Sequence, residues 1–138
     1  IDLDRIGHYD ASRFWEPIHA GDDGGLILDP DEFYILASKE RVSVPPELCA
    51  EMVAYDVLNG EFRVHYAGFF DPGFGWPGGT RAVLEVRSHE VPFLLEHGQI
   101  VGRLAYEKLT SVPSKIYGTD IGSSYGSQGL TLSKHFRK

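Results

Sequence analysis

The sequence contains a single cysteine among 138 residues, Cys49. One cysteine excludes a disulfide within the chain and a zinc site built from several thiolates. Zinc enzymes that act on nucleobases carry H-x-E followed by P-C-x-x-C, and neither pattern is present. The six histidines lack the spacing of metal ligands, which favours surface or packing roles for them. We therefore expect no metal site, and the apolar context of Cys49 indicates a buried, unreactive thiol.

Two other catalytic motifs are also missing. The chain has no G-x-S-x-G, which argues against the nucleophile turn of an α/β-hydrolase. It has no G-x-x-x-x-G-K-[ST], which argues against a P-loop. Gly73 and Gly75 form only a G-x-G fragment. A nucleotide site in this chain must therefore be built in another way.

Basic residues are outnumbered: 13 Lys and Arg stand against 20 Asp and Glu, which gives a net charge of −7. This balance argues against a nucleic-acid binder with a broad basic surface. It does not exclude a pocket for one nucleotide, because a few cations or backbone N–H groups suffice there. We therefore expect no nucleic-acid partner.

Long apolar runs are absent as well, and no signal-peptide pattern is visible. We expect no membrane partner and a cytoplasmic location. The chain begins with Ile1 rather than Met, so we also expect that it is a piece of a longer protein.

What the sequence does contain is a series of short segments in which apolar and polar residues alternate, with 16 glycines and 8 prolines between and around them. This pattern predicts an all-β sandwich, jelly roll or barrel. We expect residues 1–110 to form the β domain and residues 111–138 to form a flexible C-terminal tail. Within the domain we expect a turn at Lys39-Glu40, a helical turn over residues 47–52 and one strand over residues 61–70.

The most informative stretch runs from Asp71 to Val86. Its Gly/Pro-rich first part can bring backbone close to a ligand, and the strand that follows places Glu85 on one face with two arginines. Glu85 is either a general base or one member of an exposed charge ladder. Asp71 is either a ligand contact or a loop-start carboxylate that accepts backbone hydrogen bonds. His65 lies in the strand before this loop.

The polar residues of the C-terminal tail allow two interpretations. They are either ordinary residues of a flexible terminus or parts of a mobile flap that closes over a nucleotide. In the second reading, the tyrosines would stack, the amide would bind an amide edge and the lysine would meet phosphate. The residues concerned are Tyr117, Tyr125, Gln128 and Lys134.

Four segments, in order, resemble deoxycytidine triphosphate deaminases of the dUTPase-like superfamily. Asp71-Pro72-Gly73-Phe74 with the later Leu84-Glu85 resembles the family's D-P-G-[WF]…L-E segment. Residues 26–52 resemble its leader strands, residues 97–104 resemble its P-G-x-x-I-[GA]-x-L strand, and residues 125–129 resemble its Y-x-x-Q-x-G tail. The resemblance covers most of the chain and implies a dUTPase-like distorted jelly roll or β-barrel of the β-clip type.

The resemblance further implies hydrolysis of dCTP to dUTP and ammonia in pyrimidine deoxynucleotide synthesis. Glu85 would be the catalytic base, because water must lose a proton as it attacks C4 of cytosine and N3 must gain one. No metal would be catalytic, and Mg²⁺ would accompany the triphosphate. The implied substrate-binding residues are Asp71, Gly73, His65, Tyr117, Tyr125, Gln128 and Lys134.

Two departures from the family pattern matter. The family's S-S-x-x-R phosphate loop is replaced by residues 54–59, which include an acidic side chain, and Phe69-Phe70 stands where a basic residue is usual. The family includes tandem proteins and trimers with sites between domains. We therefore expect the partner to be another dUTPase-like domain, either an N-terminal half or a copy in a homotrimer, that supplies the phosphate loop. The alternatives are a dUTP diphosphatase and a catalytically incomplete module for nucleotide binding or assembly.

Overall fold

The computed structural model describes residues 1–22, 24–54, 62–65, 68–88, 90–121 and 130–137. Across these residues, the only helix is a single 3-10 turn, and the rest of the regular structure is β. The expectation of an all-β fold is confirmed. No helix in the described part is long and apolar enough to cross a membrane. The elements in chain order are η1 (Ala11–Arg13), β1 (Gly25–Leu28), β2 (Phe33–Val42), β3 (Leu48–Ala54), β4 (Phe62–His65), β5 (Phe69–Phe70), β6 (Thr80–Ser88), β7 (Phe93–Glu96) and β8 (Gly102–Lys108).

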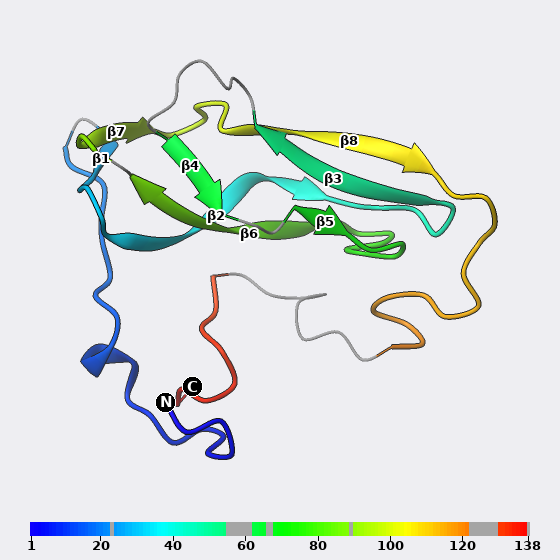
Figure 1. The fold of residues 1–138 in the computed structure, drawn as a ribbon, viewed down its shortest axis with the longest axis horizontal. Coiled ribbons are helices and arrows are strands. Elements are labelled where there is room, and N and C mark those ends of the chain that lie inside the picture. The colour runs from blue at the N-terminus through cyan, green and yellow to red at the C-terminus, as the bar shows by residue number, and fades with distance from the viewer. Residues whose placement is uncertain (23, 55–61, 66–67, 89, 122–129, 138) are drawn as a thin grey trace.

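The strands form three small antiparallel sheets that make up one body (Figure 1). Their orders are β1-β7, β2-β6-β4 and β5-β3-β8. The buried core takes residues from all three sheets, because each sheet turns one apolar face inward. Its members are Leu28, Val42, Val44, Ala50, Phe70, Ala82, Leu84 and Val86.

Strand β6 is the centre of its sheet and follows the alternation predicted from the sequence. Ala82, Leu84 and Val86 are buried, whereas Arg81, Glu85 and Arg87 are exposed. The period of two residues therefore puts the apolar set into the core and the charged set on the outer face.

Three expectations about local structure are wrong. Residues 48–54 are strand rather than helical turn, because they pair along their whole length with β8 and bury Ala50. Lys39 and Glu40 lie within β2, where a register shift between Ala37 and Arg41 accommodates them without ending the strand. Residues 61–70 do not form one strand: β4 pairs with β6, and β5 pairs with β3 in another sheet.

The two ends of the chain extend from the body and meet each other (Figure 1). We call residues 1–9 with residues 133–137 the terminal clasp. Backbone bonds join Gly7 to Lys134, His8 to His135 and Arg137 to Tyr9. Phe14 packs edge to face against both Tyr9 and Phe136, with ring centroids 5.7 and 5.6 Å apart, and Phe136 is buried.

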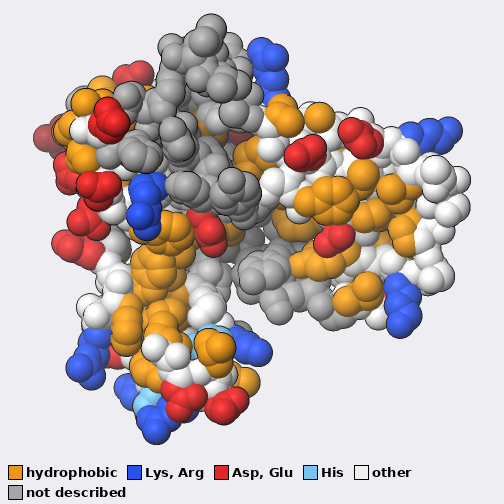
Figure 2. Space-filling model, viewed as in Figure 1, with side chains coloured by type: hydrophobic (Ala, Val, Ile, Leu, Met, Phe, Trp, Pro, Cys, Tyr) orange, Lys and Arg blue, Asp and Glu red, His pale blue; other side chains and the backbone are white. Residues whose placement is uncertain are grey.

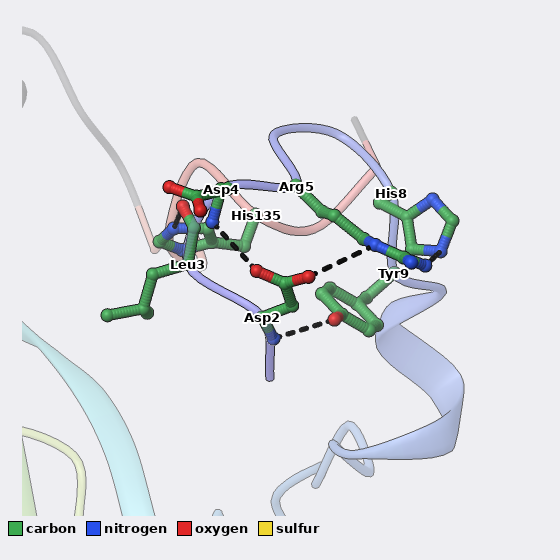
Figure 3. Close-up of polar contacts among 7 residues, drawn as sticks. All are labelled: Asp2, Leu3, Asp4, Arg5, His8, Tyr9 and His135. Atoms are coloured by element: carbon green, nitrogen blue, oxygen red, sulfur yellow. Dashed lines mark hydrogen bonds and ion pairs between the residues drawn. The ribbon is translucent and has the colours of Figure 1, made fainter.

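Polar contacts complete the clasp (Figure 3). The Asp2 carboxylate pairs with Arg5 at 3.3 Å, and Arg5 Nη1 lies 3.1 Å from Nε2 of His8. His135 Nε2 lies 3.0 Å from the carbonyl oxygen of Leu3. These polar groups are exposed, and their contacts bury little apolar surface. Most of the apolar burial in the clasp therefore comes from the aromatic cluster.

Candidate functional site

Glu85 lies in the middle of β6, between two neighbouring strands. Its register partners are Ile35 on β2 and His65 on β4, so the structure brings two predicted site residues to one rung of the sheet. The Glu85 side chain is exposed, and no other described residue donates a hydrogen bond to it or pairs with it. The backbone pairing of β6 therefore positions Glu85, and no side chain of the described part of the protein adds a polar contact to it.

The two arginines on the same face of β6 have partners other than Glu85. Arg81 donates to the carbonyl oxygen of Ser38 at 2.6 Å. The guanidinium of Arg87 lies over the ring of Phe33, 5.8 Å from its centroid, and Trp15 lies 6.1 Å from the same ring. Neither arginine forms a direct ion pair with Glu85, so these three side chains of β6 do not form a paired charge ladder among themselves.

The chain enters β6 through a loop of residues 71–79, which we call the D-P-G loop. Hydrogen bonds from neighbouring segments hold it in place. Val44 on the neighbouring segment fixes it by two backbone bonds: its N–H donates to Phe74 and its carbonyl accepts from Gly73, at 2.9 and 3.0 Å. Arg41 reaches the carbonyls of Gly78 and Gly79 from β2. Asp71 itself is exposed, and its backbone carbonyl accepts from the N–H of Phe74.

Gly73 and Tyr117 are a second pair of predicted site residues that lie together. Tyr117 donates its N–H to the carbonyl of Pro72 at 3.0 Å, and its ring stacks on Phe74 with centroids 6.2 Å apart. The φ of Gly73 is +96°, and a Cβ there would lie 2.6 Å from the carbonyl oxygen of Tyr117. The glycine is therefore needed both for the turn and for the close approach of the chain after β8.

The remaining predicted site residues are separated from these two pairs or lie outside the description. Lys134 is part of the terminal clasp, where its carbonyl accepts from Gly7 at 2.9 Å. The backbone of His65 is described but its side chain is not, and Tyr125 and Gln128 fall outside the described residues. The substrate-binding roles of all these residues stay predictions.

An open, mainly apolar groove lies elsewhere, between the N-terminal segment, β2 and the turn from β7 to β8. Trp15, Ile18, Leu36, Leu95 and Leu132 contribute to its walls, and Glu85 does not. Apolar side chains also gather on the surface of the chain ends (Figure 2), where Ile1, Leu3, Ile6, Phe14 and Ile18 are exposed.

No described group of three or more His, Cys, Asp or Glu side chains could hold a metal ion. The one described group with a clearly shifted pKa is Asp10, whose pKa is lowered by a side-chain hydrogen bond from Ser12 and then by the backbone N–H of Ser12. Asp10 caps η1, so this shift belongs to a local turn rather than to the Glu85 face.

The alternation in the sequence assigned Glu85 to the face of its strand that carries the arginines, but it did not predict which side chains from other segments lie on that face. Alternation placed Arg87 on the face of its strand that carries Glu85, but the contact of Arg87 with Phe33 depends on the pairing of these two residues across β2 and β6. Trp15 is separated from β2 along the chain by β1, and no local pattern predicts its contact with Phe33.

Comparison with known proteins gives consistent matches. The family model described as 2′-deoxycytidine 5′-triphosphate deaminase (DCD), C-terminal domain, matches residues 1–136. A curated protein of Halobacterium salinarum named dCTP deaminase, dUMP-forming, is 34% identical over 80% of this chain and 55% of its own length. One of the same name from Streptomyces coelicolor is 34% identical over 95% of this chain and 68% of its own length.

A solved structure agrees with the sequence matches. The crystal structure of 2′-deoxycytidine 5′-triphosphate deaminase from Agrobacterium tumefaciens is 68% identical, with a TM-score of 0.70. The match covers 76% of this chain but 32% of the solved one, and the chain spans about half the length of the Halobacterium relative. The expected dUTPase-like fold is confirmed.

Proposed function

The chain belongs to the dCTP deaminase family, as its C-terminal domain, and from this premise we propose that the protein containing it hydrolyses dCTP to dUTP and ammonia. Glu85 acts as the general base in this proposal. The observation that carries it is the exposed carboxylate at the centre of β6, which has no polar partner among the described residues and lies on a strand that is paired on both sides and preceded by the D-P-G loop.

In the proposed reaction, one carboxylate transfers protons from the attacking water to the cytosine base. Water attacks C4 of cytosine while its proton passes to Glu85, and N3 of the ring gains a proton. Glu85 delivers this first proton to N3, then takes the proton of the new C4 hydroxyl and passes it to the amino nitrogen, so that the C4–N4 bond breaks, ammonia leaves and the carbonyl of uracil forms. The sum is dCTP plus water giving dUTP plus ammonia, with Glu85 returned to its starting state. A strand position suits this role because it fixes the carboxylate more precisely than a loop would.

The exposure of Glu85 favours a site completed by a second domain. Proton transfer of this kind is most effective where bulk water is excluded, and the outer face of β6 is open in a single chain. We propose that another dUTPase-like domain, either a fused N-terminal half or a further copy, covers this face and supplies the Ser and Arg side chains for the phosphates. The match covers only 32% of the solved relative, which leaves room for such a partner.

In this proposal, Mg²⁺ is bound to the triphosphate of dCTP and is part of the substrate. The described side chains form no group of three or more that would hold it on their own, and no step is assigned to it. The expected substrate contacts at Asp71, Gly73, His65, Tyr117, Tyr125, Gln128 and Lys134 belong to the same proposal.

A second candidate product is dUMP. The curated relatives from Halobacterium and Streptomyces carry the name dUMP-forming, which favours a further hydrolysis of bound dUTP to dUMP and pyrophosphate. The two candidates differ in products alone. Chromatography after incubation with dCTP separates them, because dUTP accumulates in one case and dUMP with pyrophosphate in the other.

The test is Glu85→Gln in the full-length protein, with Glu51→Gln as a matched control. Glu51 is also an exposed carboxylate on a central strand, but in the other three-stranded sheet. We expect Glu85→Gln to reduce ammonia release from dCTP by about 10²-fold or more, and Glu51→Gln to leave it within about twofold. Conversion of dUTP without deamination of dCTP would instead identify a dUTP diphosphatase, and no turnover of either nucleotide would identify an assembly module.

A further inference from the structure

The chain after β8 contains a compact turn, residues 116–121, which we call the tail turn. The carbonyl of Ile116 accepts from the N–H groups of Asp120 and Ile121 at 3.0 and 3.3 Å. The Asp120 carboxylate accepts from the N–H of Ile116 at 2.9 Å, and Gly118 donates to the carbonyl of Ile121. The turn is therefore closed by its own hydrogen bonds and behaves as one small unit.

The tail turn is fixed to the D-P-G loop by a continuous stack of rings. Tyr117 stacks on Phe74 at an interplanar angle of 28°, and Phe74 meets Phe70 edge to face with centroids 5.0 Å apart. Phe70 is a core residue, only 4% exposed. A line of three aromatic side chains thus runs from the core through the loop to the tail turn.

Gly73 makes this close approach possible. A Cβ at this position would clash with Cγ2 of Ile116 as well as with the Tyr117 carbonyl. The neighbouring glycines of the loop do not face the tail turn. A Cβ on Gly75 would meet Val42 and Thr80, and one on Gly78 would meet nothing within 4 Å.

The D-P-G loop leads directly into β6, which carries Glu85 five residues after Thr80 begins the strand. We propose that Gly73 and Tyr117 are positioning residues that fix the tail turn to this loop. The tail turn is therefore held by the same loop that leads into the strand of the proposed base. The link to catalysis rests on the proposed function, whereas the attachment itself does not.

The attachment is tested by limited trypsin digestion of the full-length protein. Lys115 is exposed and immediately precedes the tail turn, so cleavage after it reports opening of the attachment. Cleavage after Lys108, at the end of β8, reports loosening of the body and serves as the internal reference. Mass spectrometry gives the rates of the two cuts in the same sample.

Tyr117→Ala and Gly73→Ala are expected to raise the ratio of the Lys115 cut to the Lys108 cut by about tenfold, since cleavage follows the population of the open form. Tyr117→Phe keeps the stacked ring, and Gly78→Ala adds a methyl group to open space, so both should leave the ratio within about twofold. An unchanged ratio in Tyr117→Ala would overturn the proposal. So would a Tyr117→Phe ratio that matches Tyr117→Ala, since the ring would then not be the attachment.

A kinetic measurement tests the positioning role separately. Tyr117→Ala should raise KM for dCTP by about fivefold or more while kcat falls less. The reason is that displacement of the tail turn weakens the binding of dCTP before it affects the chemical step. Gly78→Ala, which adds a methyl group to open space in the same loop, should match the original protein. An unchanged KM in Tyr117→Ala would limit the role to structure and overturn the positioning claim. If the original protein does not turn over dCTP, the proposed function fails, and the digestion still decides the attachment.

Discussion

The two faces of β6 belong to one regular strand but differ in role: one packs into the core, and the other carries the proposed base. The inner face presents Ala82, Leu84 and Val86, each less than 7% exposed, to a core shared by three sheets. The outer face presents Glu85, which has no polar partner in the described part of the chain, between one arginine bound to Ser38 and another stacked on Phe33. Stability is concentrated on one face and the proposed chemistry on the other. Substitutions on the two faces should therefore separate stability from activity.

The largest effect on stability is expected from the inner face. Leu84→Ala should lower the free energy of unfolding by about 2–5 kcal/mol, because it removes buried methyl groups and leaves a cavity. Val83→Ala, on the half-buried outer side of the same strand, should cost about 1 kcal/mol or less. Urea denaturation followed by circular dichroism measures both. Equal losses would mean that the two faces do not differ in packing.

The same contrast explains what the sequence could predict. The alternation along residues 80–88 is local, so it correctly assigned each side chain to a face. A Gly/Pro-rich loop followed by a strand was also predicted over residues 71–86, and the D-P-G loop and β6 have this form because both signals are local. The helical turn expected over residues 47–52 was wrong because seven cross-strand pairs with β8, far along the chain, override the local preference after Pro46.

Contacts between distant segments account for the other omissions. The terminal clasp joins residues that are more than a hundred positions apart, such as Leu3 and His135. The stack of Phe70, Phe74 and Tyr117 combines a strand, a loop and the chain after β8. Neither arrangement leaves a periodic signal in the sequence, so only the fold reveals them.

An intermediate effect is expected from the aromatic contact on the outer face. Phe33→Ala removes the ring shared by Trp15 and Arg87, and should lower stability by about 1 kcal/mol through lost ring and cation–π contacts. Thermal denaturation measures the loss, and Ile27→Ala on exposed β1 is a control for loss of a surface apolar side chain. If both variants lose the same amount, the Phe33 contacts add nothing beyond surface burial.

A smaller effect is expected from Arg87→Lys. Lysine keeps the positive charge but loses the planar group that lies over Phe33, so the cost should be about 0.5 kcal/mol. In a Phe33→Ala background the same change should cost almost nothing. A double-mutant cycle measures this coupling, and a coupling energy of zero would show that the two side chains act independently.

The smallest effect on stability is expected from the residue with the largest proposed role in catalysis. Glu85→Gln should change the free energy of unfolding by less than about 0.5 kcal/mol, because the side chain is exposed and has no polar partner among the described residues. Urea denaturation of the two proteins side by side tests this. A loss of several kcal/mol would show that Glu85 supports the fold, and would make any loss of activity ambiguous.

The most direct test of the account is therefore ammonia release from dCTP by the full-length protein with Glu85→Gln, measured on samples whose unfolding curves match that of the original protein. The account predicts a folded protein that still binds the nucleotide and has lost about 10²-fold or more of its deamination rate. Deamination at the original rate by that folded variant would contradict it, because the base would then have to be another group.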